Sequence, residues 1–323
     1  MESSTGSGSQ PRLQLDRLAE EALAERSPGG LLADALEAAF GDVSEALAPN
    51  VALESISRID RKRSRTVLKS ICLLEAADRA EASVHGLARG LRSGPTTNGN
   101  APSSPRFTPS GATPEGHTAM GLAGAWLRAR ATELVAELGA SALHEQARAL
   151  TLMAAGWRRE AQDLYDAART PRRCLETAQQ RSGSLNALAA CLNAIVEENR
   201  DVESLRRFGA GLGTAALIRD DIQRLSEPAN ESHPLRRGAY SLPVACALEA
   251  NPKLASRLGG AVAEDVVAEI VAEIRAAGGF ERAREESEQH IADAIEAIKG
   301  IEGTDGLVAV AEGVATHVSE AAA

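Results

Sequence analysis

Apolar and polar residues recur along most of this chain with the spacing of an α-helix. A first amphipathic segment contains the apolar residues Leu13, Leu15, Leu18, Ala19 and Ala22. Proline and glycine at positions 28–30 interrupt it, residues 31–47 give a second segment, and residues 51–91 carry one or two more. No stretch alternates apolar and polar positions between hairpin turns, so we expect no β-strands.

The same helical spacing continues through the rest of the chain, in segments joined by short connections. It predicts helices at His117–Leu138, Ser141–Ala168, Arg172–Gln180, Ser184–Glu198, Val202–Leu225, Leu242–Glu249, Lys253–Ala277, Phe280–Ile298 and Gly306–Ala321. Helices of this length with short turns between them are typical of a helical bundle. The pattern therefore predicts an all-α protein.

Two stretches fall outside the helical pattern. Residues 1–11 are rich in serine and glycine and predict a flexible tail. Residues 92–116 are dominated by proline, glycine, serine, threonine and asparagine, through which a helix does not continue. We interpret them as a flexible surface loop within a single all-helical domain that spans residues 12–323, in preference to a linker between two domains. A loop of this length is usually either functional or disordered.

Composition narrows the class of protein. Aromatic residues make up only 2% of the 323 residues, so alanine, leucine, valine and isoleucine must build the core. The net charge of -10 argues against nucleic acid as a partner, because phosphate binding needs a positive field. The 4 cysteines lack zinc-site spacing and indicate thiols in a reducing compartment. Without an apolar run of transmembrane length or a signal-peptide core, we expect a cytoplasmic protein.

The most informative stretch runs from about residue 205 to residue 248. In it, apolar residues and glycines lead into the acidic pair Asp220-Asp221, and a polar loop is followed by Gly-Ala-Tyr-Ser-Leu-Pro at positions 238–243. Further stretches match in the same order at Gly116–Leu127, at Glu176-Thr177 followed by Ser184-Leu185, and at Gly278–Ile298. Together these stretches resemble the trans-isoprenyl diphosphate synthases, or polyprenyl synthetase family, over roughly residues 116–321.

The resemblance implies an all-α helical bundle of the class I isoprenoid (polyprenyl) synthase type around a central cavity, usually as a homodimer. It also implies that two aspartate-rich motifs face each other and hold Mg²⁺ on the diphosphate of an allylic substrate. Carboxylate oxygens are suitable ligands for this hard cation. In this chain Asp220 and Asp221 match the metal-binding positions, and Thr177 and Leu217 match positions next to the substrate.

The first of the two aspartate-rich motifs has no counterpart in this sequence. Between Asp78 and Asp163 there is no aspartate at all. In the best register, Gly86, Leu87 and Gly90 stand where the three acids belong. The resemblance therefore implies a metal site with one of its two halves missing.

The second motif is incomplete. Its third acid is replaced by Arg224, which lies one helical turn after Asp220, so we expect this guanidinium to pair with the Asp220 carboxylate. Two lysines that bind the diphosphate in the family are replaced by Glu176 and Ala239. Taken without the family, an adjacent aspartate pair on a helix is more often a solvated face than a metal site.

Several basic residues match, more weakly, positions that bind diphosphate oxygens in the family. They are Lys62, Arg63 and Arg65, Arg92 in the proline-rich stretch, and Arg237 beside the Gly-Ala-Tyr-Ser-Leu-Pro run. The alternative for the first three is a solvated basic helix start, and for Arg237 an ordinary loop position.

Three functions stay open at this point. The chain is an isoprenoid-diphosphate-binding homologue or a non-catalytic partner of an active synthase, because most of the diphosphate site is missing. Alternatively, it is an active Mg²⁺-dependent prenyltransferase or terpene-synthase-like enzyme that acts on allylic diphosphates through Asp220, Asp221 and substituted cations. A third possibility is that the tail and the loop at 92–116 are docking segments for another protein.

Overall fold

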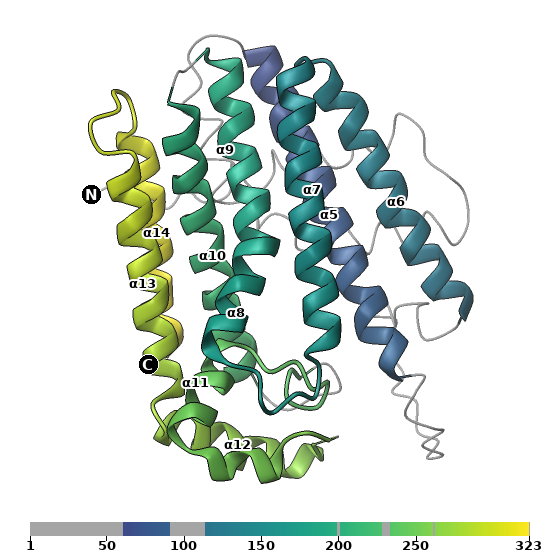
Figure 1. Ribbon diagram of the computed structural model, residues 1–323, viewed down its shortest axis with the longest axis vertical. Helices are drawn as coiled ribbons and strands as arrows, with labels where there is room; N and C mark the ends of the chain where they lie inside the picture. Colours follow the sequence, from purple (N-terminus) through teal and green to yellow (C-terminus); the bar gives the residue numbers. More distant parts are fainter. Residues whose placement is uncertain (1–60, 91–113, 199–200, 228–232, 261, 323) are drawn as a thin grey trace, which may run out of the picture. The chain divides into compact units, whose positions relative to one another are not determined.

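The computed structural model describes residues 61–90, 114–198, 201–227, 233–260 and 262–322. All secondary structure within these ranges is helical, as Figure 1 shows, and none of it is a strand. The prediction of an all-α fold is therefore confirmed. The predicted tail at 1–11 and the helical segments before residue 61 lie outside the described residues. No helix in the described ranges combines the length and apolar character that a membrane span requires.

Contacts between residues divide the chain into two compact units, which are described separately. The smaller unit contains α5 (Arg61–Gly90) and α6 (Pro114–Ala136), two long helices that pack on each other. At their contact, a Cβ at Gly124 would make ordinary van der Waals contact with the carbonyl oxygen of Ala77, at 3.6 Å. Helix α6 begins at Pro114, so the predicted loop at 92–116 is too long by the residues 114–116, and its remainder lies outside the described residues.

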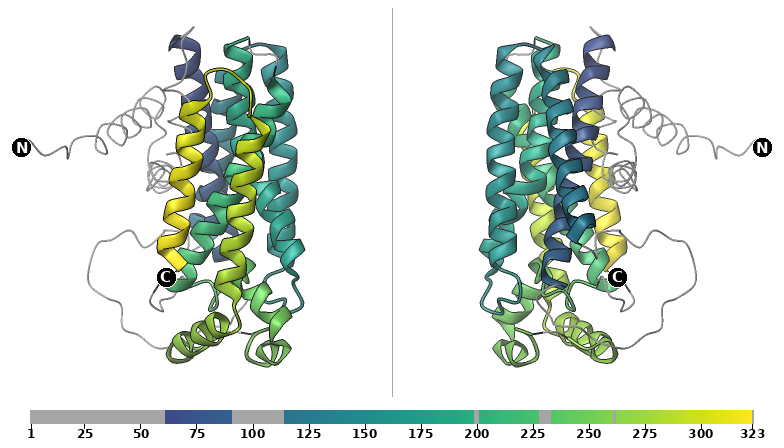
Figure 2. Two further views of the ribbon diagram at one scale, coloured as in Figure 1. Left: turned by 90° about the vertical axis from the view of Figure 1, so that its left-hand side faces the viewer. Right: turned by 90° about the vertical axis from the view of Figure 1, so that its right-hand side faces the viewer.

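The larger unit contains the remaining helices. They are α7 (Ala140–Gln162), α8 (Pro171–Ala178), a π-helical turn (Gln179–Gly183), α9 (Ser184–Val196), α10 (Val202–Ser226), α11 (Leu242–Ala250), a 3₁₀ turn (Pro252–Arg257), α12 (Glu264–Ala276), α13 (Gly279–Ala297) and α14 (Asp305–Ala322). Helix α10 packs against α9, α13 and α14, and α13 and α14 run side by side (Figure 2). The core of this unit therefore lies around α10, with Phe208, Leu212, Ile218 and Ile222 fully buried.

Two glycines bring α9 and α10 into direct backbone contact. A Cβ at Gly209 would lie 2.4 Å from the carbonyl oxygen of Asn186, and a Cβ at Gly213 would lie 2.3 Å from that of Ser182. Real Cβ atoms do not approach other atoms this closely, so only glycine fits at either position. This contact fixes α10, which carries the candidate site, against the π-helical turn and α9.

The predicted helices differ from the observed ones in three places. Helix α7 ends at Gln162, and residues 163–170 form an ordered loop. The predicted gap after residue 180 is instead a π-helical turn that joins α8 to α9 without a break. The predicted helix at 253–277 is interrupted because Gly259, at φ +91°, turns the chain between the 3₁₀ segment and α12.

Candidate functional site

The acidic pair Asp220-Asp221 stands near the end of α10, where one side of the helix is fixed in the core. Ile218, Ile222 and Leu225 are fully buried, and their spacing places them on one stripe of the helix. Asp220 and Asp221 are half-buried beside that stripe. Apolar packing of α10 is therefore sufficient to hold both carboxylates in position.

The Asp220 carboxylate pairs with its neighbour in the sequence. Arg219 donates to Asp220 Oδ1 from Nη2 at 2.8 Å and from Nε at 3.1 Å. The predicted pairing of Asp220 with Arg224 is therefore wrong. The physical reason is that the Arg219 side chain folds along α10 to the same carboxylate, while Arg224 is exposed and forms no ion pair with any residue that the structure describes.

Asp221 is in a different environment from Asp220. Its carboxylate accepts no hydrogen bond within the described ranges. The residue as a whole is partly exposed to solvent, but its carboxyl group is surrounded by protein atoms. This burial raises the pKa of Asp221 to about 7, even though Arg224 acts in the opposite direction. The charge of Glu160 also raises this pKa, whereas Arg181 and Arg169, like Arg224, lower it. At neutral pH the Asp221 carboxyl is therefore only partly ionised.

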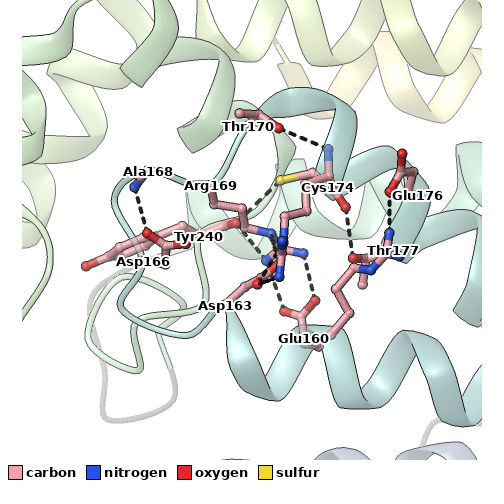
Figure 3. A network of polar contacts seen from close by, with 12 residues as sticks. Glu160, Asp163, Asp166, Ala168, Arg169, Thr170, Cys174, Glu176, Thr177 and Tyr240 are labelled. Atoms are coloured by element: carbon pink, nitrogen blue, oxygen red, sulfur yellow. Dashed lines mark hydrogen bonds and ion pairs between the residues drawn. The ribbon is translucent and has the colours of Figure 1, made fainter.

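A buried ion cluster lies behind this pair and organises the loop between α7 and α8 (Figure 3). The side chain of Arg169 is only 3% exposed, and it pairs with Glu160 at 2.9 Å and with Asp163 at 3.4 Å. Its Nη1 also donates to the carbonyl oxygen of Tyr240 at 3.0 Å. Arg173 forks onto the other side of Asp163, at 2.6 and 2.7 Å. Arg169 thereby ties the end of α7 to the segment that leads into α11.

The segment at 233–241 is held against this loop by backbone contacts. The backbone N–H of Tyr165 donates to the carbonyl of Gly238 at 2.8 Å. Gly238 has a φ of +68°, and a Cβ there would lie 2.4 Å from the Tyr165 ring, so both conformation and contact require glycine. Arg237 is half-buried just before this glycine, and burial, together with the like charge of Arg224, lowers the pKa of its guanidinium.

The residues predicted from the lysine-threonine motif of the family are engaged in structural contacts. The Glu176 carboxylate accepts from Arg172 at 3.0 Å and pairs with Arg159. The Thr177 hydroxyl is buried and donates to the carbonyl of Arg173 at 2.9 Å. Its proximity to a substrate stays a prediction from the resemblance alone.

Sequence reasoning missed a second basic–hydroxyl pair, Arg181-Ser182, in the π-helical turn. The guanidinium carbon of Arg181 lies 3.6 Å from the centroid of the Trp157 ring, and its charge acts on both Glu160 and Asp221. The sequence contains the signal for this pair. Five residues after Glu176, a basic residue and a hydroxyl residue precede Gly-Ser-Leu at positions 183–185. Within this turn the Ser182 hydroxyl accepts from Asn186 Nδ2 at 3.5 Å, so only Arg181 acts on the carboxylates.

For the other predicted site residues, the structure gives only their position and exposure. Leu217 is half-buried on α10, four residues before Asp221. Lys62, Arg63 and Arg65 lie in the first turns of α5, in the smaller unit, with Lys62 and Arg65 exposed. Arg92 lies outside the described residues. The diphosphate-binding roles of these residues, like that of Arg237, stay predictions.

Comparisons with known proteins agree on one family. No family model matches the chain. The nonaprenyl diphosphate synthase of Mycobacterium tuberculosis is 33% identical over 201 residues, which cover 58% of this chain and 60% of that protein. The match thus spans about 60% of the length of the curated relative.

Solved structures of the same kind share the fold. A decaprenyl diphosphate synthase from Rhodobacter capsulatus superposes with a TM-score of 0.72 at 18% identity, covering 95% of this chain and 99% of that one. A polyprenyl synthase from Caulobacter crescentus, solved with calcium and isoprenyl diphosphate, gives 0.74 at 20% identity and 94% of both chains. The chain is thus similar to polyprenyl diphosphate synthases in sequence over part of its length and in fold over most of it. Its all-α fold is that of the polyprenyl synthases.

Magnesium is the cation expected in this family, and the residues present do not fit it. No group of three His, Cys, Asp or Glu residues suited to a metal occurs among the residues that the structure describes. One oxygen of Asp220 is already bound by Arg219, and Asp221 is only partly ionised at neutral pH. Mg²⁺ needs ionised oxygen ligands in octahedral geometry, so the donor set near the end of α10 is a poor one for this cation.

Proposed function

We propose that this chain is an isoprenoid-diphosphate-binding member of the family that lacks standard chain-elongation chemistry and acts as a partner of an active synthase. The observation that carries the proposal is the state of the acidic pair. Asp220 is bound by Arg219 at 2.8 Å, and burial raises the pKa of Asp221 to about 7. Neither carboxylate is thus prepared to take up a metal ion.

The sequence of the opposite motif supports the same proposal. No aspartate occurs between Asp78 and Asp163, so two facing carboxylate clusters cannot be assembled from aspartates. The family's two lysines are replaced by Glu176 and Ala239, and Glu176 is held by Arg159 and Arg172. Ionisation of an allylic diphosphate depends on metal and cation charge at the leaving group, and most of that charge is missing.

Retention of the fold without the chemistry has a physical explanation. The core around α10 consists of apolar side chains and glycine contacts, with Ile218 and Ile222 buried beneath the acidic pair. Burial of such side chains supplies most of the folding free energy, and no metal takes part. Ligand residues of the site can therefore be lost while the bundle remains.

Turnover assays test the proposal directly. The purified full chain is incubated with Mg²⁺, isopentenyl diphosphate and geranyl or farnesyl diphosphate, and prenyl products are separated by chromatography. We expect no elongated product above the level of a blank, together with measurable binding of the isoprenyl diphosphates. Addition of the chain to an active polyprenyl synthase tests the partner role through the rate and chain length of that enzyme's products.

The second candidate function is an active Mg²⁺-dependent prenyltransferase with a non-standard site. The observation that favours it is Arg181-Ser182, a basic–hydroxyl pair whose charge reaches Asp221 and can replace a lost lysine. Elongated product that disappears in the Asp220→Ala/Asp221→Ala double variant would establish this function and refute the first.

A further inference from the structure

Arginines from three separate elements surround the end of α10, and two of them act directly on the Asp221 carboxyl. Arg224 is on α10 itself, Arg181 is in the π-helical turn, and Arg237 is in the segment that precedes α11. Arg224 and Arg181 both act on the Asp221 carboxyl, and Arg224 also acts on Arg237. The third acid of the family's motif has thus been replaced by one member of a cluster of cations.

Hydrogen bonds hold Arg237 close to Arg224. His233 Nε2 lies 3.4 Å from the carbonyl oxygen of Leu225, which directly follows Arg224. The backbone N–H of Arg237 donates to the carbonyl of His233 at 3.2 Å, which closes a tight turn. These bonds hold the turn that carries Arg237 against the end of α10, and the charge of Arg224 acts on the Arg237 guanidinium.

The neighbouring acids that the structure describes are already paired with other arginines. Glu160 and Asp163 are occupied by Arg169 and Arg173, and Asp220 is occupied by Arg219. Neither Arg224 nor Arg237 forms an ion pair with any residue in the described ranges. One carboxyl, that of Asp221, faces the cluster without such a partner, so the local surplus of charge is positive and favours an anion over a cation.

Arginine is the side chain best suited to such an anion. Its planar guanidinium presents paired N–H donors that match two phosphate oxygens, and it stays charged in partly buried positions. The two neighbouring guanidinium groups offer this geometry to a diphosphate without an intervening metal. In the usual arrangement the carboxylates bind the anion only through bound Mg²⁺.

We infer that the site near the end of α10 binds the diphosphate of an isoprenoid ligand directly, through Arg224 and Arg237, without a divalent metal ion. This inference rests on the proposed function and specifies how its ligand is held. In this inference Arg224 contacts the diphosphate directly and takes the place of the bound Mg²⁺ between protein and ligand.

The test is a titration of the full chain with farnesyl diphosphate and with inorganic pyrophosphate by calorimetry, in EDTA and in Mg²⁺. We expect both anions to bind in EDTA, with a Kd that Mg²⁺ does not improve. Arg224→Gln and Arg237→Gln should each weaken binding about tenfold, as expected for loss of a charge-assisted hydrogen bond. Arg207→Gln, an exposed position elsewhere on α10, is the matched control and should change nothing.

A charge-reversal variant distinguishes direct contact from general electrostatics. Arg224→Asp restores the family's third carboxylate on a helix whose fold does not depend on this exposed side chain. We expect this variant to lose binding in EDTA, and any binding that remains should require Mg²⁺. Far-UV circular dichroism verifies that each variant is folded.

Each contrary outcome has a distinct meaning. Binding of farnesyl diphosphate by the unmodified chain only in Mg²⁺ overturns this inference and leaves the proposed diphosphate-binding function intact. Binding in EDTA that neither Arg224→Gln nor Arg237→Gln weakens overturns the assignment of residues. Absence of binding in both conditions overturns the inference and the proposed function together.

Discussion

At the scale of single residues, the guanidinium of Arg169 decides how the loop between α7 and α8 is held. It is almost fully buried, donates hydrogen bonds to Glu160 and to the carbonyl of Tyr240, and forms an ion pair with Asp163 (Figure 3). Removal of the guanidinium would leave the Glu160 carboxylate in a poorly solvated place without its main counter-charge, whereas Asp163 would keep Arg173. The cost of such an uncompensated charge exceeds the net gain from the pair itself.

We therefore expect Arg169→Met to destabilise the protein by about 3 kcal/mol, as measured by urea unfolding followed by circular dichroism. Arg172→Met is the matched control, because Arg172 also pairs with a glutamate but its side chain is 88% exposed. Exposed pairs contribute little, so the control should change stability by less than about 0.5 kcal/mol. Equal effects of the two substitutions would show that burial of Arg169 has no energetic consequence.

Sequence reasoning at this scale named the acidic pair but mispredicted its ion pairing. The acidic pair and Arg237 were found from their order along the chain, and the structure places Arg237 close to Arg224. The partner of Asp220 was assigned wrongly, since spacing on a helix favours both a neighbour and a residue one turn away, and only side-chain geometry decides between Arg219 and Arg224. The Arg169 cluster joins positions 71 residues apart, which no local pattern records.

At the scale of elements, the contact between α9 and α10 sets the position of the site. Gly209 approaches the carbonyl of Asn186 so closely that a methyl group would overlap backbone, and backbone cannot move without displacing a whole helix. Flexible side chains could yield to such an insertion, but here the obstructing atoms belong to the backbone of the first turn of α9. The two helices would have to separate along their length.

Gly209→Ala should therefore destabilise the fold by about 2 kcal/mol or more, in the range observed for overpacked cores. Gly313→Ala, in α14, provides the contrast, because nothing lies within 4 Å of a Cβ at that position. Alanine is the better helix former, so this control should be stabilised by about 0.5–1 kcal/mol. Thermal unfolding of both variants measures the difference, and a neutral Gly209→Ala would contradict the tight contact between α9 and α10.

Helix boundaries were predictable where the apolar periodicity itself ends. The helical periodicity of α9, α10 and α13 gave their ends to within about two residues, as expected for boundaries of this kind. The interruption before α12 was missed although Gly259 and the residue after it are both glycine. The end of α7 could not be found, because the loop at 163–170 is stabilised by Arg169 and Tyr165 contacts with a distant segment.

At the scale of the whole molecule, two carboxyl groups of the same cluster give stability opposite dependences on pH. Burial would raise the pKa of Glu160, but Arg169 and Arg181 outweigh burial and hold the pKa below its usual 4.5. Burial raises the pKa of Asp221 from its usual 3.8 to about 7, although Arg224, Arg181 and Arg169 face it. Arg169 and Arg181 therefore outweigh burial at Glu160 but not at Asp221.

The signs follow from proton binding in the folded and unfolded states. Glu160 releases its proton more readily when folded, so its contribution is present above pH 4.5 and is lost as the pH falls through its folded pKa. Asp221 keeps its proton more firmly when folded, so stability falls as the pH rises from about 4 to about 7 and then levels off. The two windows overlap, so the opposite effects of these two groups balance and together favour maximal stability near pH 4.

Thermal unfolding of three proteins across pH 3 to 8 tests this account, with a midpoint measured at each pH. Asp221→Asn should remove the decline above pH 4 and be more stable than the unmodified chain at pH 8, by at least about 1 kcal/mol. Glu160→Gln should be less stable at neutral pH and should lose less stability between pH 4.5 and pH 3. A decline above pH 4 that persists in Asp221→Asn would assign that dependence to another group, and an unchanged acid limb in Glu160→Gln would show that its pairing with Arg169 does not contribute there.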